Sequence, residues 1–400
     1  MTLAPAPTPK PATPREAPGQ AMPPPGSVGF VETRTMVLPG LMTLESGRTL
    51  RDIVVAYEVY GTISAARDNV ILVCHALSGD AHAAGYHQGG GAKPGWWDTM
   101  IGPGKAFDTD HYAVLCSNVL GGCRGTTGPL SLDPETDAPY AATFPVVTIG
   151  DMVQVQAALL DRLGIYRLAA VAGGSMGGMQ ALHWSTAYPA RVESVVVLAS
   201  CARLTAQALA FNAVGRQAIM SDPRWRGGRY PTDDPPTGGL AAARMIGHLT
   251  YLSAEGLEHR FGRRHQYGDG DGFTLDTDFQ VESYLEHQGA SFVNRFDANC
   301  YLYMTRALDY FDLGAGSGSL SAALARATAS FFLASLSTDW LYPPAQTEEL
   351  AAALAEAGAS AEVVALDSLH GHDGFLLEHE ALGPRIRAFL GREDAAQARS

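Results

Sequence analysis

The stretch Ala172-Gly-Gly-Ser-Met-Gly-Gly-Met179 decides the fold of this 400-residue chain. An apolar run over 168–171, typical of a buried strand, precedes it, and a helix-like run over 180–187 follows. Between them, Gly173 to Gly177 match G-x-S-x-G, a sharp turn from strand to helix that exposes a nucleophilic serine, here Ser175, at its apex. Glycines two residues before and after Ser175 let neighbouring backbone pass without a Cβ clash. The chain has 44 glycines, so the motif needs support from its context.

That support comes from an alternation of strand-like and helix-like segments along the chain. Continuous apolar runs bounded by turn residues are typical of buried parallel strands, and they occur at 69–74, 112–117, 192–199, 330–336 and 362–366. Helical spacing is found at 148–164, where Thr148 caps the helix, and at 344–357 and 376–390. Short β-like runs at 33–38, 42–44 and 53–60 predict an antiparallel edge. The pattern predicts an α/β-hydrolase fold with a mostly parallel central sheet.

The segment 203–327 breaks this alternation. It contains helix-like stretches at 206–221, 240–252, 280–288 and 295–310 and no clear strand. We therefore expect a helical lid inserted over the site. The sheet core is predicted over 27–202 and 328–392. Residues 1–26 hold nine prolines and are expected to form a disordered tail, and the polar residues 393–400 a frayed end.

Composition excludes several classes of protein. A formal net charge of −13 argues against binding to nucleic acid or to an anionic membrane surface. The five cysteines are scattered without a C-x-x-C pair, which fits reduced thiols. No apolar run approaches the ~18 residues of a membrane span, and the N-terminus lacks the pattern of a signal peptide. These observations predict a soluble cytoplasmic protein.

Candidates for acyl-transfer chemistry follow the strands in the order Ser175, Asp339, His372, which is the chain order of the α/β-hydrolase triad. A histidine base activates the serine, and a carboxylate holds the histidine tautomer. Spacing alone leaves His370 as a rival of His372, and Asp367 and Asp373 as rivals of Asp339. The backbone N–H groups of Leu77, after an early strand, and of Met176, after the serine, are the candidate oxyanion hole.

Other polar residues receive structural interpretations. His75 precedes the serine, against the usual order, and is expected to shape its loop. His82 and His87 have no third ligand at metal spacing, so we expect loop histidines and no metal site. Arg124, in a glycine-rich loop, is equally compatible with binding an anion and with bracing that loop.

Seven segments resemble the homoserine O-acetyltransferase family across residues 30 to 390. They are A-G-G-S-M-G-G-M-Q (172–180), N-V-L-G-G-C-R-G-T-T-G-P (118–129), G-L-A-A-A-R-M-I-G (239–247), Q-V-E-S-Y-L (280–285), R-F-D-A-N-C-Y-L-Y-M (295–304), S-T-D-W-L-Y-P-P (337–344) and G-H-D-G-F-L (371–376). The resemblance implies methionine biosynthesis with acetyl-CoA as co-substrate and no other cofactor. It implies that Ser175 is acetylated, that His372 deprotonates L-homoserine, and that Asp339 is the acid. It also implies that Arg244 binds the homoserine carboxylate and Asp373 its amino group, in a homodimer joined through lid helices.

Four alternatives stay open. Relatives that use succinyl-CoA resemble D-W-R where this chain has Leu341, and an apolar residue offers a succinyl carboxylate nothing, which favours acetyl. One methylene separates serine from homoserine as acceptor, a difference worth only ~1–3 kcal/mol. An esterase or thioesterase would use the same triad. A non-catalytic binding protein would not need Ser175.

Overall fold

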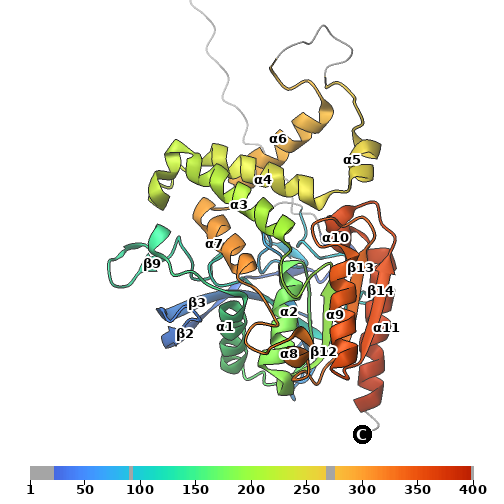
Figure 1. Ribbon diagram of the computed structural model, residues 1–400. Coiled ribbons are helices and arrows are strands. Elements are labelled where there is room, and N and C mark those ends of the chain that lie inside the picture. Colours follow the sequence, from blue (N-terminus) through green and yellow to red (C-terminus); the bar gives the residue numbers. More distant parts are fainter. Residues whose placement is uncertain (1–21, 90–92, 267–274, 398–400) are drawn as a thin grey trace, which may run out of the picture.

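The computed structural model describes residues 22–89, 93–266 and 275–397 (Figure 1). Most of the predicted tail, residues 1–21, lies outside the described residues. An eight-stranded sheet forms the centre, in the order β14-β13-β12-β11-β4-β8-β3-β2. Its strands are β2 (Arg34–Thr43), β3 (Thr49–Tyr60), β4 (Val70–Cys74), β8 (Ala113–Ser117), β11 (Leu168–Gly174), β12 (Val192–Leu198), β13 (Ser330–Leu336) and β14 (Ala361–Leu366).

The pairing within this sheet confirms the predicted parallel sheet with an antiparallel edge. Strands β14, β13, β12, β11, β4 and β8 are parallel, whereas β3 pairs antiparallel with β8 and β2 antiparallel with β3. The central strands β4 and β8 are buried along their whole length, which explains their continuous apolar sequences.

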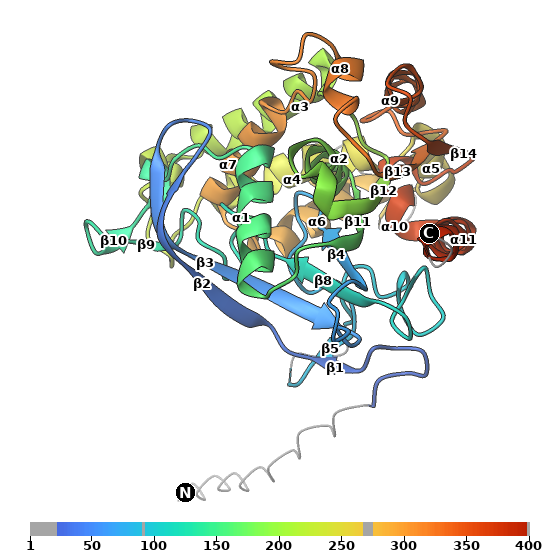
Figure 2. The same ribbon diagram turned by 90° about the horizontal axis from the view of Figure 1, so that it is seen from below.

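Helices cover both faces of the sheet (Figure 2). One face packs against α1 (Ile149–Arg162), α2 (Met176–Ala187) and α9 (Pro344–Glu356), and the other against α11 (His379–Gln397) and the segment around Trp97. Thr148 begins α1 as predicted: its hydroxyl accepts from the Asp151 N–H, and the Asp151 carboxylate accepts from the Thr148 N–H.

Between β12 and β13 the described residues form helices and add no strand to the sheet. Helix α4 (Thr237–Tyr251) packs against both α3 (Ala206–Ser221) and α6 (Gln280–Val293), above the core in Figure 1, with α5 (Ala254–Arg260) beside them. In contrast, α7 (Ala298–Asp309) and α8 (Leu320–Leu324) bury Met304, Leu308 and Leu324 in the main core. The last third of the predicted lid therefore packs with the sheet domain.

The C-terminal helix differs from the expectation. After the short α10 (Gly374–Leu377), α11 continues to Gln397, instead of ending near residue 390 with a frayed tail over 393–400. The segment is polar, but Glu, Ala and Gln are good helix formers, so polarity alone does not end the helix. None of the helices in the described ranges is both long and apolar enough to cross a membrane. The five cysteines are free thiols.

Candidate active site

Ser175 lies at a strained turn between β11 and α2. Its backbone has φ 57° and ψ −126°, a conformation that non-glycine residues rarely adopt. The turn is held from below, because the Ser175 N–H donates to Leu198 O at 3.0 Å and Ser200 Oγ donates to Ser175 O at 2.7 Å. A Cβ on Gly173 would overlap the backbone of Gly177. The flanking glycines are thus required by close approach, as the motif predicts.

The two candidate oxyanion donors come from the start of α2 and from the loop after β4. Met176 is the first residue of α2, so its N–H has no acceptor within the helix. Leu77 follows β4, and its side chain lines the same cavity as Ser175. Among the described residues, neither of these N–H groups donates to a backbone carbonyl. A Cβ on Gly177 would overlap the Cys74 carbonyl oxygen, so glycine allows α2 to approach the strand that leads to Leu77.

The acid and the histidine meet across two loops. His372 Nδ1 lies 2.7 Å from Asp339 Oδ2, and both side chains are almost completely buried. Asp339 Oδ1 accepts the N–H groups of Leu341 and Tyr342 at 3.0 and 2.9 Å, which fixes the carboxylate. The rivals lie elsewhere: His370 is half exposed near Glu378. Asp367 accepts a hydrogen bond from Ser337.

Electrostatics around His372 favour the protonated imidazole. Burial lowers its pKa, but the charge and hydrogen bond of Asp339 and the charge of Asp373 outweigh burial, and the pKa lies above its usual range. The rings of Tyr342 and Phe375 pack against the imidazole, with ring centroids 4.9 and 5.6 Å from its own, and help to bury it. No hydrogen bond between Ser175 and His372 is found within the described part of the chain, but catalytic contacts often tighten only when substrate binds.

Opposite charges stand beside Ser175 in the cavity. Arg244, from α4, reaches down between the rings of Phe292 and Tyr251, at 4.6 and 5.5 Å, and its Nη1 lies 3.4 Å from Ser78 Oγ. In the described ranges no carboxylate lies within 4 Å of its guanidinium. Asp373, next to His372, is partly buried, and burial raises its pKa against the opposing charges of His372 and Arg244. The pair can hold a zwitterion, with a guanidinium for its carboxylate.

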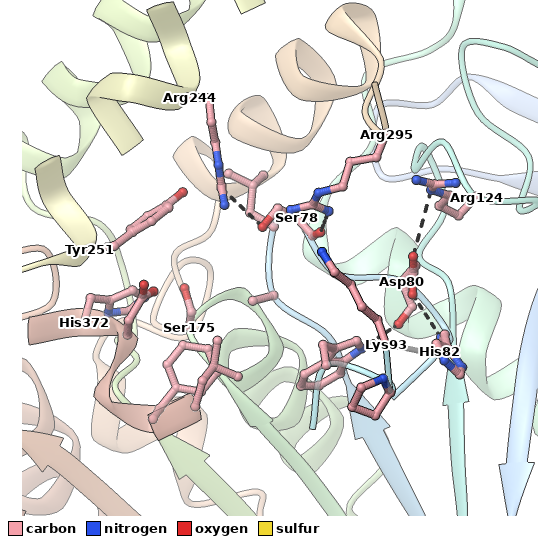
Figure 3. A pocket seen from close by; sticks show the side chains of 18 of the residues that line it. Ser78, Asp80, His82, Lys93, Arg124, Ser175, Arg244, Tyr251, Arg295 and His372 are labelled. Atoms are coloured by element: carbon pink, nitrogen blue, oxygen red, sulfur yellow. Dashed lines mark hydrogen bonds and ion pairs between the residues drawn. The ribbon is translucent and has the colours of Figure 1, made fainter. Parts of the chain in front are cut away.

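The cavity has a volume of about 600 Å³ and extends beyond these residues (Figure 3). Ser175, His372, Tyr251 and Arg244 occupy one end in the view of Figure 3, and the other end is rich in cations. Those cations come from the glycine-rich loops and from the segment after α6, and they are Lys93, Arg124 and Arg295.

His82 and His87 also line the cavity, and the sequence interpretation missed their partner. Glu58, on β3, is fully buried and lies 3.0 Å from His82 Nδ1 and 2.8 Å from His87 Nε2. It also accepts the hydroxyls of Thr33 and Tyr60 at 2.7 and 2.9 Å. The ligand atoms of the three residues lie within 4.8 Å of one another, a donor set of the kind metals use. Because four hydrogen bonds already satisfy the carboxylate, we interpret the cluster as a network that fastens the loop to β3.

Two other sequence interpretations have clear outcomes. His75 is buried, its Nε2 accepts the Val119 N–H at 3.1 Å and its Nδ1 contacts Ala76 O at 2.8 Å, so its predicted role in shaping the loop is confirmed. Leu341 does not line the catalytic cavity but packs against the hydrophobic core. The side chain of Leu341 therefore makes no contact with a donor in this cavity.

Sequence reasoning missed Tyr251, Arg295, Ser78 and Glu58. Ser78 follows Leu77 directly, and Arg295 opens one of the quoted motifs, but no local pattern shows that their loops converge. The Arg295 guanidinium donates to Ser78 O at 2.9 Å, a contact across 217 residues of sequence.

Comparison with known proteins agrees with this geometry. The α/β-hydrolase-fold family matches residues 69–375. A homoserine O-acetyltransferase from Solidesulfovibrio magneticus is 53% identical over 379 residues, covering 93% of this chain and 96% of that protein. The crystal structure of homoserine O-acetyltransferase from Bacillus anthracis is 31% identical with a TM-score of 0.85, covering 90% of this chain and 98% of that one. Esterase E22 is similar too, at 33% identity and a TM-score of 0.83, with 90% and 100% of the two chains covered.

Proposed function

The chain belongs to the homoserine O-acetyltransferase family, and on that premise we propose that it transfers the acetyl group of acetyl-CoA to the hydroxyl of L-homoserine through an acetyl ester on Ser175. The observation that carries the proposal is the pair Arg244 and Asp373 in the cavity of Ser175. An α-amino acid presents a carboxylate and an ammonium close together. The two side chains offer the matching charges beside the nucleophile.

In the first half-reaction, Ser175 Oγ attacks the thioester carbonyl carbon while His372 Nε2 takes the hydroxyl proton. Asp339 accepts the Nδ1–H of His372, so Nε2 carries the free electron pair. The Asp339 carboxylate also stabilises the imidazolium that forms. The N–H groups of Leu77 and Met176 donate to the oxyanion, each worth about 3–4 kcal/mol in known cases. The C–S bond then breaks, the CoA sulfur leaves with the proton from His372, and Ser175 carries the acetyl ester.

In the second half-reaction, the homoserine hydroxyl gives its proton to His372 and attacks the acetyl ester. Arg244 and Asp373 hold the carboxylate and the ammonium, which turns the hydroxyl toward Ser175. The ester bond to Ser175 breaks, and the serine regains a proton from His372. The product is O-acetyl-L-homoserine.

A steady-state assay tests the proposal. Purified protein is given acetyl-CoA or succinyl-CoA, each with L-homoserine, L-serine or no acceptor, and thiol release and product mass are followed. O-acetylhomoserine as the main product supports the proposal. Succinylhomoserine as the main product would mean that the donor is succinyl-CoA, and acetylserine that the acceptor is L-serine. Either result would leave the role of Ser175 as the nucleophile unchanged.

Hydrolysis is the second candidate, because an esterase is among the similar structures. It needs the same nucleophile and base but no acceptor pair. Thiol release that is independent of homoserine would favour it. The charges of Arg244 and Asp373 beside Ser175 favour transfer, because an acceptor held there competes with water for the acetyl ester.

We also propose a cytoplasmic homodimer joined through lid helices. Helix α3 supports this, because it exposes Leu209, Val214 and Met220. Light scattering coupled to size exclusion tests the assembly: a monomer at micromolar concentration would contradict it.

A further inference from the structure

The catalytic cavity shares Arg124 and Arg295 with a second cavity of about 400 Å³. We propose that the two cavities form one binding site for the CoA half of the donor, with the diphosphate at these two arginines and the adenosine in the second cavity. The inference rests on the proposed use of acetyl-CoA and assigns the residues that recognise its remote half.

The two arginines retain donors for an anion. Arg295 uses Nη1 for Ser78 O and lies on the Phe292 ring at 5.1 Å, and no carboxylate in the described parts of the chain lies within 4 Å of it. Among the described carboxylates, Arg124 has one distant partner, Asp80, at 3.9 Å. Burial and the charges of Arg244 and Arg124 lower the pKa of Arg295 although the charge of Asp80 opposes them, as expected for a cation among other cations. A bound polyanion would relieve that repulsion.

The positions of the arginines match the order of groups in acetyl-CoA. The thioester lies at one end of the molecule, the pantetheine arm follows, and the diphosphate and adenosine come last. In Figure 3, Ser175 and His372 lie at one end of the cavity, and Arg124 and Arg295 lie toward the other, with Lys93 between them. The second cavity continues from the arginines. Among the described pockets, it alone shares lining residues with the catalytic cavity.

The second cavity suits a nucleoside. Apolar side chains of Pro129, Leu130, Val293 and Phe296 line it, and they offer flat contact for a purine. Asn294 also lines it: its Nδ2 donates to Ala290 O at 3.0 Å, and its Oδ1 can accept from a purine amino group or a ribose hydroxyl. Its walls come from the loop around Arg124, from the segment around Arg295 and from residues 228–240, so each arginine belongs to a segment that lines the second cavity.

The test compares acetyl-CoA with acetyl-pantetheine, which has the same thioester and arm but no phosphate and no adenosine. Arg124→Gln and Arg295→Gln are expected to lower kcat/KM for acetyl-CoA about tenfold to a hundredfold, the usual effect of a lost charge-assisted hydrogen bond. With acetyl-pantetheine the same variants are expected to stay within about twofold of the wild type. The matched control is Arg167→Gln, since Arg167 pairs with Glu193 and lines neither cavity.

A second pair of variants tests the adenosine cavity. Leu130→Glu places a carboxylate at a half-exposed position in its wall, and Leu132→Glu does the same two residues away, outside the wall. Leu130→Glu is expected to raise the KM for acetyl-CoA about tenfold without changing acetyl-pantetheine turnover, whereas Leu132→Glu changes neither.

If the Arg124 and Arg295 variants lose kcat/KM equally with both donors, the two arginines only brace their loops, and the proposal is overturned. Unchanged kinetics with acetyl-CoA would overturn it as well, as would a wild type that uses both donors equally well. Failure of the proposed function looks different: no acetylhomoserine forms with either donor. Thiol release would then still compare the two donors and report on the arginines.

Discussion

The side-chain amide of Gln180 donates to the backbone carbonyl of His75 at 3.2 Å. This buried contact joins the helix behind Ser175 to the loop that carries Leu77. The same nitrogen lies 3.2 Å from Met176 O, and the Gln180 oxygen accepts from Gln156 at 2.8 Å. One side chain therefore spans the two segments that supply the proposed oxyanion donors, and it sets the distance between them.

Gln180→Leu is expected to lower kcat about tenfold to a hundredfold. Loss of a whole oxyanion donor costs 10²–10³ in rate, and misplacing the donors forfeits part of that. Gln156 also loses an acceptor for its buried amide, which destabilises the fold by about 1–3 kcal/mol. Acyl-transfer kinetics and urea unfolding measure the two effects, with Gln217→Leu on α3 as control. Full kcat in a folded Gln180→Leu sample would rule out the positioning role.

Asp339→Asn tests the base. His372 acts when neutral, and its pKa is raised, so kcat/KM of the wild type should fall as pH drops through a value above the usual ~6.5 of histidine. Without the carboxylate, burial dominates and the acidic limb moves to lower pH. The rate itself should drop about 10³–10⁴-fold, because the tautomer is no longer held. A pH profile of kcat/KM checks both, and an unmoved limb would assign the titration to another group.

The fold and much of the candidate site could be predicted from the sequence because the patterns that indicate them are local. The buried strands are continuous apolar runs, and the glycines around Ser175 predict the turn there. Contacts between distant segments have no such signature. Glu58 lies in an ordinary strand, and only the folded sheet shows that it meets His82 and His87. Leu341 is a second example, since proximity in sequence to Asp339 does not place its side chain in the cavity.

Asp373→Asn is expected to separate the two half-reactions. The amide cannot pair with the homoserine ammonium, so the KM for homoserine should rise about a hundredfold, in keeping with a lost charge-assisted contact. Acetylation of Ser175 does not involve that ammonium. A burst of p-nitrophenol from p-nitrophenyl acetate should keep its rate and amplitude within about threefold. A burst that falls together with homoserine turnover would show that Asp373 acts on the base and not on the acceptor.

Glu58, which contacts His82 and His87, makes the stability of the fold depend on pH in the acid range. Burial raises the pKa of Glu58, but hydrogen bonds from His82, Thr33 and His87 and the charge of His82 outweigh it, and the pKa falls to about 2. A carboxyl whose pKa is lowered in the folded state stabilises the fold above its unfolded pKa of about 4.5. The contribution, about 3 kcal/mol, is lost as the pH falls from about 4.5 toward 2.

Glu58→Gln should therefore unfold about 3 kcal/mol more easily at pH 7, and its stability should depend less on pH below 4.5. Free energies of urea unfolding between pH 7 and pH 3 measure this. Glu349→Gln is the control, because Glu349 makes an exposed pair with Arg203, a type worth only about 0–1 kcal/mol. If Glu58→Gln and Glu349→Gln lose equal stability and keep the same pH slope, the Glu58 cluster does not hold the loop on β3. The cluster would then be a local arrangement of the cavity wall.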